Sequence, residues 1–168
     1  MEAISVVVCN YQGARHLPHC LGALRAQTHA PAELIVVDNA STDAGEALVR
    51  ERFPEARWIG LQRNAGPAPA RNRGLVEAAH RLVLLVDNDA VLAPDCLERL
   101  AAAWREGVAL VQPRSVFDAD PARVHYDGAR FHYAGLYSLR NFGVPLERAE
   151  GQGVLEVDGA VSVVLLAD

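Results

Sequence analysis

Short apolar runs alternate along the chain with segments whose apolar residues recur every three or four positions. The first run, 4–9, is rich in β-branched residues and ends at the polar loop Asn10-Tyr11-Gln12-Gly13. Such a run is typical of a strand buried on both faces. Leu17, Leu21 and Leu24 follow at helical spacing. The chain therefore opens with a predicted strand, a loop and a helix.

The same unit recurs through the first two-thirds of the sequence. Further strands are predicted at 33–37, 57–61, 82–86 and 108–111, and helices at 45–53, 70–79 and 94–105. Strands that alternate with helices favour an α/β fold, a Rossmann-like, mainly parallel sheet with helices on both faces. From about Ser115 the pattern favours hairpins or an ordered loop region, with two further short strands at 154–158 and 161–166.

Composition narrows the possible classes of protein. A chain of 168 residues suits one domain with a real core. The net charge of -5 argues against a nucleic-acid-binding protein, because phosphate binding requires clustered basic residues. The three cysteines, Cys9, Cys20 and Cys96, lie in apolar patterns without metal spacing, so we expect buried free thiols. With no signal-peptide pattern at the N-terminus, we expect a cytoplasmic protein.

Polar residues follow each of the first four predicted strands. They are Asn10-Tyr11, Asp38-Asn39, the segment 64–72 and Asp87-Asn88-Asp89. In a parallel sheet the carboxyl ends of the strands share one edge, and ligands bind there. We therefore expect these four segments to form one ligand site.

The chemistry of these segments suits a phosphate-bearing ligand and a hard metal ion. Asp87 and Asp89 leave a buried strand two residues apart, and Mg²⁺ or Mn²⁺ commonly binds one or two carboxylates plus substrate phosphates. Asp38 can accept an N–H of a nucleobase, and Tyr11 offers a face for stacking. Arg71 lies near a helix start, where anions bind. An Asx turn, a packed tyrosine and a solvated arginine remain the alternative interpretations.

Together the segments ISVVVCNYQG, ELIVVDNASTD, NAGPAPARNRGL and LVLLVDNDAVLAPD resemble the successive motifs of family 2 glycosyltransferases with a GT-A fold. The resemblance spans about residues 4–113, which would be the nucleotide-sugar-binding part, and 114–168 would begin the acceptor side. The form DNASTD and the Asn-Tyr-Gln-Gly loop are similar to bacterial rhamnosyltransferase-like members that build cell-surface polysaccharide.

The resemblance implies roles for particular residues. Tyr11 would stack on the base, Asp38 would hydrogen-bond it, and Arg71 would help hold the base-side loop. Asp87 would approach the ribose, and Asp89 would bind the Mg²⁺ or Mn²⁺ that bridges the diphosphate. We also assign Asn39, Asn64 and Asn88 to the nucleotide-sugar site. The expected partners are a nucleotide-diphosphate sugar and a glycan or lipid-linked acceptor.

Two departures from the family pattern lie on the acceptor side. Ser162-Val163 stands where family members usually carry a Gly-Ala step. The family's general base is an acidic residue some tens of residues further on, so we expect an N-terminal fragment whose base lies beyond residue 168. We expect neither Asp158 nor Asp168 to replace it. The apolar stretch 154–166 would then be partly uncovered, which predicts self-association, and association of the full-length protein with the inner face of the membrane stays open.

Three other functions differ in the motifs that they require. A non-catalytic nucleotide-sugar-binding domain agrees with a missing base. A sugar nucleotidyltransferase requires a Gly-rich basic loop after the first strand, and CNYQGARH is not such a loop. A phosphatase with Asp87 as nucleophile requires its DxD after the first strand rather than the fourth.

Overall fold

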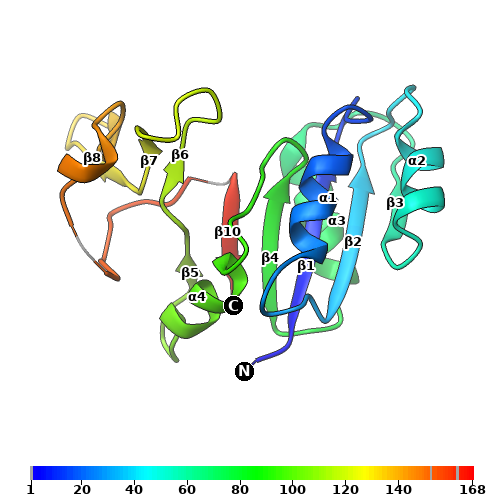
Figure 1. The fold of residues 1–168 in the computed structure, drawn as a ribbon, viewed down its shortest axis with the longest axis horizontal. Helices are drawn as coiled ribbons and strands as arrows, with labels where there is room; N and C mark the ends of the chain where they lie inside the picture. Colours follow the sequence, from blue (N-terminus) through cyan, green and yellow to red (C-terminus); the bar gives the residue numbers. More distant parts are fainter. Residues whose placement is uncertain (1, 152, 162) are drawn as a thin grey trace.

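The computed structural model describes residues 2–151, 153–161 and 163–168. Alternating strands and helices occupy the first part of the chain, and short strands follow (Figure 1). In chain order the elements are β1 (Ile4–Asn10), α1 (Leu17–Arg25), β2 (Glu33–Asp38), α2 (Gly45–Arg52), β3 (Arg57–Gly60), α3 (Pro67–Glu77), β4 (Leu82–Asp87), α4 (Cys96–Ala103), β5 (Leu110–Val111), β6 (Ser115–Val116), β7 (Val124–Tyr126), β8 (Ala129–Phe131), β9 (Tyr137–Leu139), the 3₁₀ helix η1 (Leu146–Arg148) and β10 (Val164–Ala167).

The central sheet has the strand order β3-β2-β1-β4-β10-β5. Strands β1 to β4 pair in parallel, and β10 runs antiparallel to both β4 and β5. In Figure 1 the red β10, which lies close to the end of the chain, is placed between the green β4 and β5. The predicted α/β fold with a mainly parallel sheet is confirmed.

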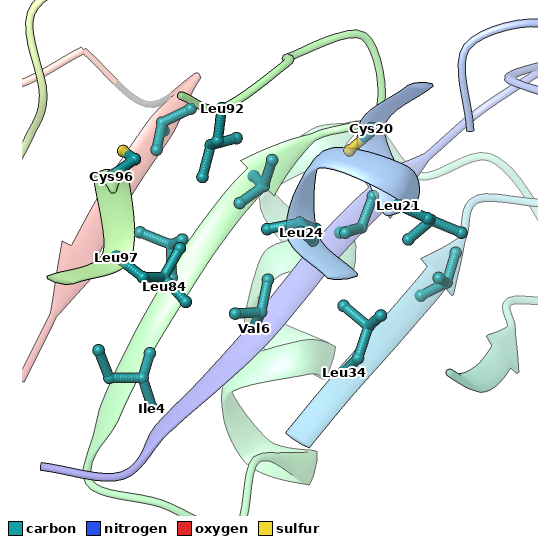
Figure 2. Close-up of a cluster of buried hydrophobic side chains, with 14 of the residues drawn as sticks. Ile4, Val6, Cys20, Leu21, Leu24, Leu34, Leu84, Leu92, Cys96 and Leu97 are labelled. Atoms are coloured by element: carbon teal, nitrogen blue, oxygen red, sulfur yellow. The ribbon is translucent and has the colours of Figure 1, made fainter. Parts of the chain in front are cut away.

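Helices cover both faces of this sheet, because alternate residues of its strands point to opposite sides. On one face Val6 and Val8 of β1 belong to a large apolar cluster with side chains of α1, α2 and α4. Figure 2 shows Leu21 and Leu24 of α1 and Leu97 of α4 over this face. On the other face Val7 packs with Ala70 of α3. The central sheet is therefore packed between two apolar cores, one on each face, and these fix the position of the carboxyl ends of its strands.

The C-terminal part differs from the prediction in one element. The predicted strand 154–158 is wrong: these residues form no strand, and Val154 and Leu155 are exposed. Gly151 and Gly153 have positive φ, which suits turns rather than extended pairing. The predicted strand 161–166 is observed as β10, four residues long; Ser162, in the predicted range, lies outside the described residues.

Two small antiparallel sheets, β6-β7 and β8-β9, confirm the expected hairpin region after Ser115. Asp127 lies between them with its side chain nearly buried, and it accepts hydrogen bonds from Arg114 at 2.9 Å and Asn141 at 2.8 Å. In the described part of the chain, each helix is too short or too polar to cross a bilayer.

Candidate donor-binding site at the carboxyl edge of the sheet

The parallel register places the predicted site segments side by side. Asn10 at the end of β1 is level with Asp38 at the end of β2, and Cys9 is level with Asp87 at the end of β4. The loops that leave these strands therefore begin at one edge of the sheet. Hydrogen bonds described below join all four segments, which confirms that they meet.

Asp38 is nearly buried at this edge and is held by three donors. Its Oδ1 accepts hydrogen bonds from Asn10 Nδ2 at 2.7 Å and Ser41 Oγ at 2.5 Å. Its Oδ2 accepts the backbone N–H of Ser41 at 2.8 Å. These three hydrogen bonds therefore fix the carboxylate in one orientation.

Asn10 connects Asp38 with the Asp-Asn-Asp segment after β4. Its Oδ1 accepts a hydrogen bond from Asn88 Nδ2 at 2.7 Å, while its Nδ2 donates to Asp38. Gly13 packs against this pair so closely that a Cβ at residue 13 would clash with both amides. The close approach of the loop at Gly13 therefore requires glycine.

Asn39 links the second strand end with the loop before α3. Its Nδ2 donates to Asn64 Oδ1 and to the carbonyl of Gly66, each at 2.9 Å, and its Oδ1 accepts the N–H of Ala65 at 3.0 Å. Both amide hydrogens of Asn39 are thus engaged within the protein. The structure gives Asn39 and Asn64 a role in shaping the loop, and their predicted contact with the nucleotide stays a prediction.

Arg71, in α3, forms an ion pair with Asp87, and its predicted role in holding the base-side loop stays a prediction. Its Nη2 donates to Asp87 Oδ1 at 2.6 Å, and the two side chains are 15% and 29% exposed. Burial raises the pKa of Asp87, the Arg71 guanidinium lowers it, and nearby Asp89 raises it further; the net change is upward. Burial therefore outweighs the favourable effect of Arg71 on the ionisation of Asp87.

Asp89 is exposed beside Asp87, and this pair suits a divalent cation. Across 2–151, 153–161 and 163–168 there is no group of three or more His, Cys, Asp or Glu side chains that would hold a metal by itself. Mg²⁺ and Mn²⁺ do not need one, since one or two carboxylates and the oxygens of a diphosphate suffice. The charge of Asp89 adds to the raised pKa of Asp87, and a bound cation would offset the repulsion between the two carboxylates.

Of the other residues considered from the sequence, Tyr11 lies at this edge of the sheet, whereas Asp168 and Asp158 lie elsewhere. Tyr11 is half exposed directly after β1, so a face for stacking is accessible. Asp168 lies at the opposite edge, because β10 runs antiparallel to β4, and it accepts a hydrogen bond from Arg81 at 2.7 Å. Asp158 is exposed outside the regular elements.

Three residues beside the site were not named as ligand contacts in the sequence prediction. Asn10 lay in the first polar segment and Ser41 in the motif DNASTD, and neither was predicted to bond Asp38. Tyr126 of β7 is buried, and its pKa is raised by that burial and by Asp87 and Asp89. Nothing in the spacing of the sequence would bring Tyr126 to the fourth strand end, because the connection is irregular.

Comparison with known proteins agrees with this geometry. The succinoglycan biosynthesis protein ExoO of Rhizobium meliloti is 37% identical over 98 residues, which are 58% of this chain and 28% of that protein. The structure of S. aureus TarS 1–349 in complex with UDP-GlcNAc superposes with a TM-score of 0.56 at 29% identity, covering 60% of this chain and 30% of TarS 1–349. The mannosyltransferase PcManGT from Pyrobaculum calidifontis, in complex with GDP-Man and Mn²⁺, gives 0.60 at 27% identity, covering 71% and 37%.

The chain spans about a third of the length of the curated relatives it matches. The family model described as "Glycosyl transferase family 2" matches residues 5–155, most of the chain. With the parallel sheet and its polar carboxyl edge, this match establishes that the chain belongs to glycosyl transferase family 2.

Proposed function

We propose that this chain binds a nucleotide-diphosphate sugar at the carboxyl edge of β1 to β4, in an enzyme that transfers the sugar to an acceptor hydroxyl with inversion. The observation that carries the proposal is the hydrogen-bonded line from Asp38 through Asn10 to Asn88, between Asp87 and Asp89. It joins an acceptor for a base to carboxylates for a metal within one site.

Each end of the site has its own role in this proposal. Tyr11 stacks on the base and Asp38 accepts its N–H, while Asp87 approaches the ribose. Asp89 holds Mg²⁺ or Mn²⁺, which would neutralise the diphosphate as it leaves. Arg71 keeps Asp87 in position through their 2.6 Å ion pair.

The similar proteins support the substrate class. The names of the TarS and PcManGT structures state complexes with UDP-GlcNAc and with GDP-Man and Mn²⁺. ExoO is named for succinoglycan biosynthesis. We infer a role in cell-surface polysaccharide or glycan synthesis, with a glycan or lipid-linked acceptor; rhamnosyl transfer and a cytoplasmic location stay predictions.

An inverting transfer also needs a base that takes the proton of the acceptor hydroxyl. Asp168 does not suit this role, because it lies at the amino edge of β4 in an ion pair with Arg81. Asp158 is exposed and is not held by a strand or helix. We therefore assign the base to neither residue.

Calorimetric titration with UDP, dTDP and GDP, with and without Mn²⁺, tests donor binding. We expect one nucleotide at least to bind in a metal-dependent manner, and Asp89→Ala to abolish the metal dependence. Glu51→Ala is the matched control, because Glu51 is also exposed and acidic but lies near the end of α2, which leads away from the site. Absence of binding to every nucleotide by a folded sample would contradict the proposal.

A further inference from the structure

Most hydrogen-bond acceptor positions of the Asp38 carboxylate are already occupied by donors of the protein. A carboxylate offers about four acceptor positions, two on each oxygen. Asn10 Nδ2 and Ser41 Oγ occupy Oδ1, at 2.7 and 2.5 Å, and the N–H of Ser41 occupies one position on Oδ2, at 2.8 Å. Counting donors from the described residues, a single acceptor position on Oδ2 stays available for a ligand.

The orientation of these donors is fixed by their other partners. A carboxylate can only accept, so the NH₂ group of Asn10 must face Asp38, and the opposite Oδ1 accepts from Asn88 at 2.7 Å. Ser41 Oγ accepts the N–H of Gln12 at 2.8 Å, so its own hydrogen is directed to Asp38. Neither residue can leave Asp38 without breaking a second hydrogen bond.

Nucleobases differ in what they would present to one acceptor. Uracil and thymine carry a single N–H between two carbonyl groups on their pairing edge. Guanine carries two adjacent donors, a ring N–H and an amino group, which need an acceptor each. Cytosine and adenine place a ring nitrogen acceptor beside their amino group, and this nitrogen would face the negative carboxylate.

We propose that Asn10 and Ser41 determine base specificity: by leaving Asp38 one open acceptor, they select a pyrimidine with a single N–H, as in uridine or thymidine diphosphate, over guanosine diphosphate. The inference rests on the proposed function, because it assumes that Asp38 meets the base. A guanine bound there leaves one donor unpaired in a nearly buried place, and a site rejects such a ligand strongly.

Titration of the folded chain with UDP, dTDP and GDP in Mn²⁺ tests the specificity directly. We expect UDP or dTDP to bind at least about tenfold tighter than GDP. Ser41→Ala vacates one position on Oδ1, so Asp38 could then accept two adjacent donors, and the preference should fall by about tenfold. Ser41→Thr keeps the hydroxyl group and should keep the preference for UDP or dTDP over GDP.

Thr42→Ala is the matched control, because Thr42 lies in the same loop and bonds Gln12 Nε2 at 3.0 Å without contacting Asp38. The preference of Thr42→Ala for UDP or dTDP over GDP should equal that of the native chain. Metal-dependent binding in which GDP equals or exceeds the pyrimidine nucleotides would overturn the inference and leave the proposed function standing. An unchanged preference in Ser41→Ala would also overturn it, whereas no nucleotide binding at all would refute both proposals.

Discussion

At the scale of single residues, the raised pKa of Asp87 makes the stability of the folded chain depend on pH. Burial raises its pKa above the ordinary value of 3.8, and Arg71 offsets this only in part. At low pH the carboxyl is protonated in both the folded and the unfolded chain. As the pH rises through the raised pKa, ionisation is easier in the unfolded chain, so the stability that this group contributes is lost.

The first prediction follows from the direction in which this contribution to stability changes with pH. The free energy of unfolding of the native chain, relative to Asp87→Asn, should fall as the pH rises above the ordinary aspartate pKa of 3.8. Urea denaturation of both proteins at several pH values measures this difference. Asp120→Asn, the same substitution at an exposed aspartate, is measured in parallel as the control. A difference that rises with pH at Asp87 would show that the Arg71 pair dominates.

The second prediction concerns the three thiols. Burial raises the pKa of Cys9 and of Cys96 to about 11 and that of Cys20 to about 12. Only the thiolate reacts with alkylating reagents, so at pH 8 each native thiol should react about a hundredfold more slowly than an unfolded one. Iodoacetamide labelling followed by mass spectrometry, with and without urea, measures the rates. Labelling of Cys20 at the unfolded rate would contradict its burial between α1, to which it belongs, and β4.

How much of the site was predictable also depends on the residue. Asp38 and Asp87 could be located because each ends a continuous apolar run, and parallel strands bring such ends together. The bonds of Asn10 and Ser41 to Asp38 could not, because the direction of an amide or a hydroxyl depends on partners far along the chain. The Arg71 contact with Asp87 was missed for the same reason.

At the scale of elements, two helical glycines test how closely the helices pack. A Cβ at Gly74 of α3 would clash with the side chain of Val7 in β1, whereas a Cβ at Gly22 of α1 would meet nothing within 4 Å. Gly74→Ala should therefore lower the free energy of unfolding by about 1–3 kcal/mol. Gly22→Ala should raise it by up to about 1 kcal/mol, because alanine favours the helix.

Urea denaturation of the two variants makes a matched comparison, since both add one methyl group to the interior of a helix. A stabilising Gly74→Ala would mean that α3 can move away from β1 without loss. A strongly destabilising Gly22→Ala would mean that the outer side of α1 is covered in solution.

The elements of the first two-thirds were predictable because their patterns are local. Apolar runs gave β1, β2 and β4, and helical spacing gave α1 and α4. The direction of β10 was not predictable, because an apolar run does not state whether it pairs in parallel or antiparallel. The predicted strand 154–158 failed because extended propensity needs a pairing partner, and Val154 and Leu155 are exposed instead.

At the scale of the whole molecule, Tyr126 in the region 112–160 lies near enough to Asp87 and Asp89 for their charges to influence it. This tyrosine is buried, and Asp87 and Asp89 contribute to its raised pKa. The region itself is held by Asp127, which binds Arg114 and Asn141 and lies 3.8 Å from Arg140. Loss of that carboxylate should therefore loosen the region that contains Tyr126.

The last prediction is that Asp127→Ala lowers the free energy of unfolding of the 112–160 region by about 3 kcal/mol, since two largely buried arginines lose their anion. Hydrogen exchange should show faster exchange in β6 to β9 while β1, β2 and β4 keep their protection. Asp120→Ala removes only an exposed pair with Arg123 and should change exchange little. Equal loss of protection in both parts of the chain would mean that the two parts unfold as one cooperative unit, in which case Asp127 supports the whole sheet rather than its own region.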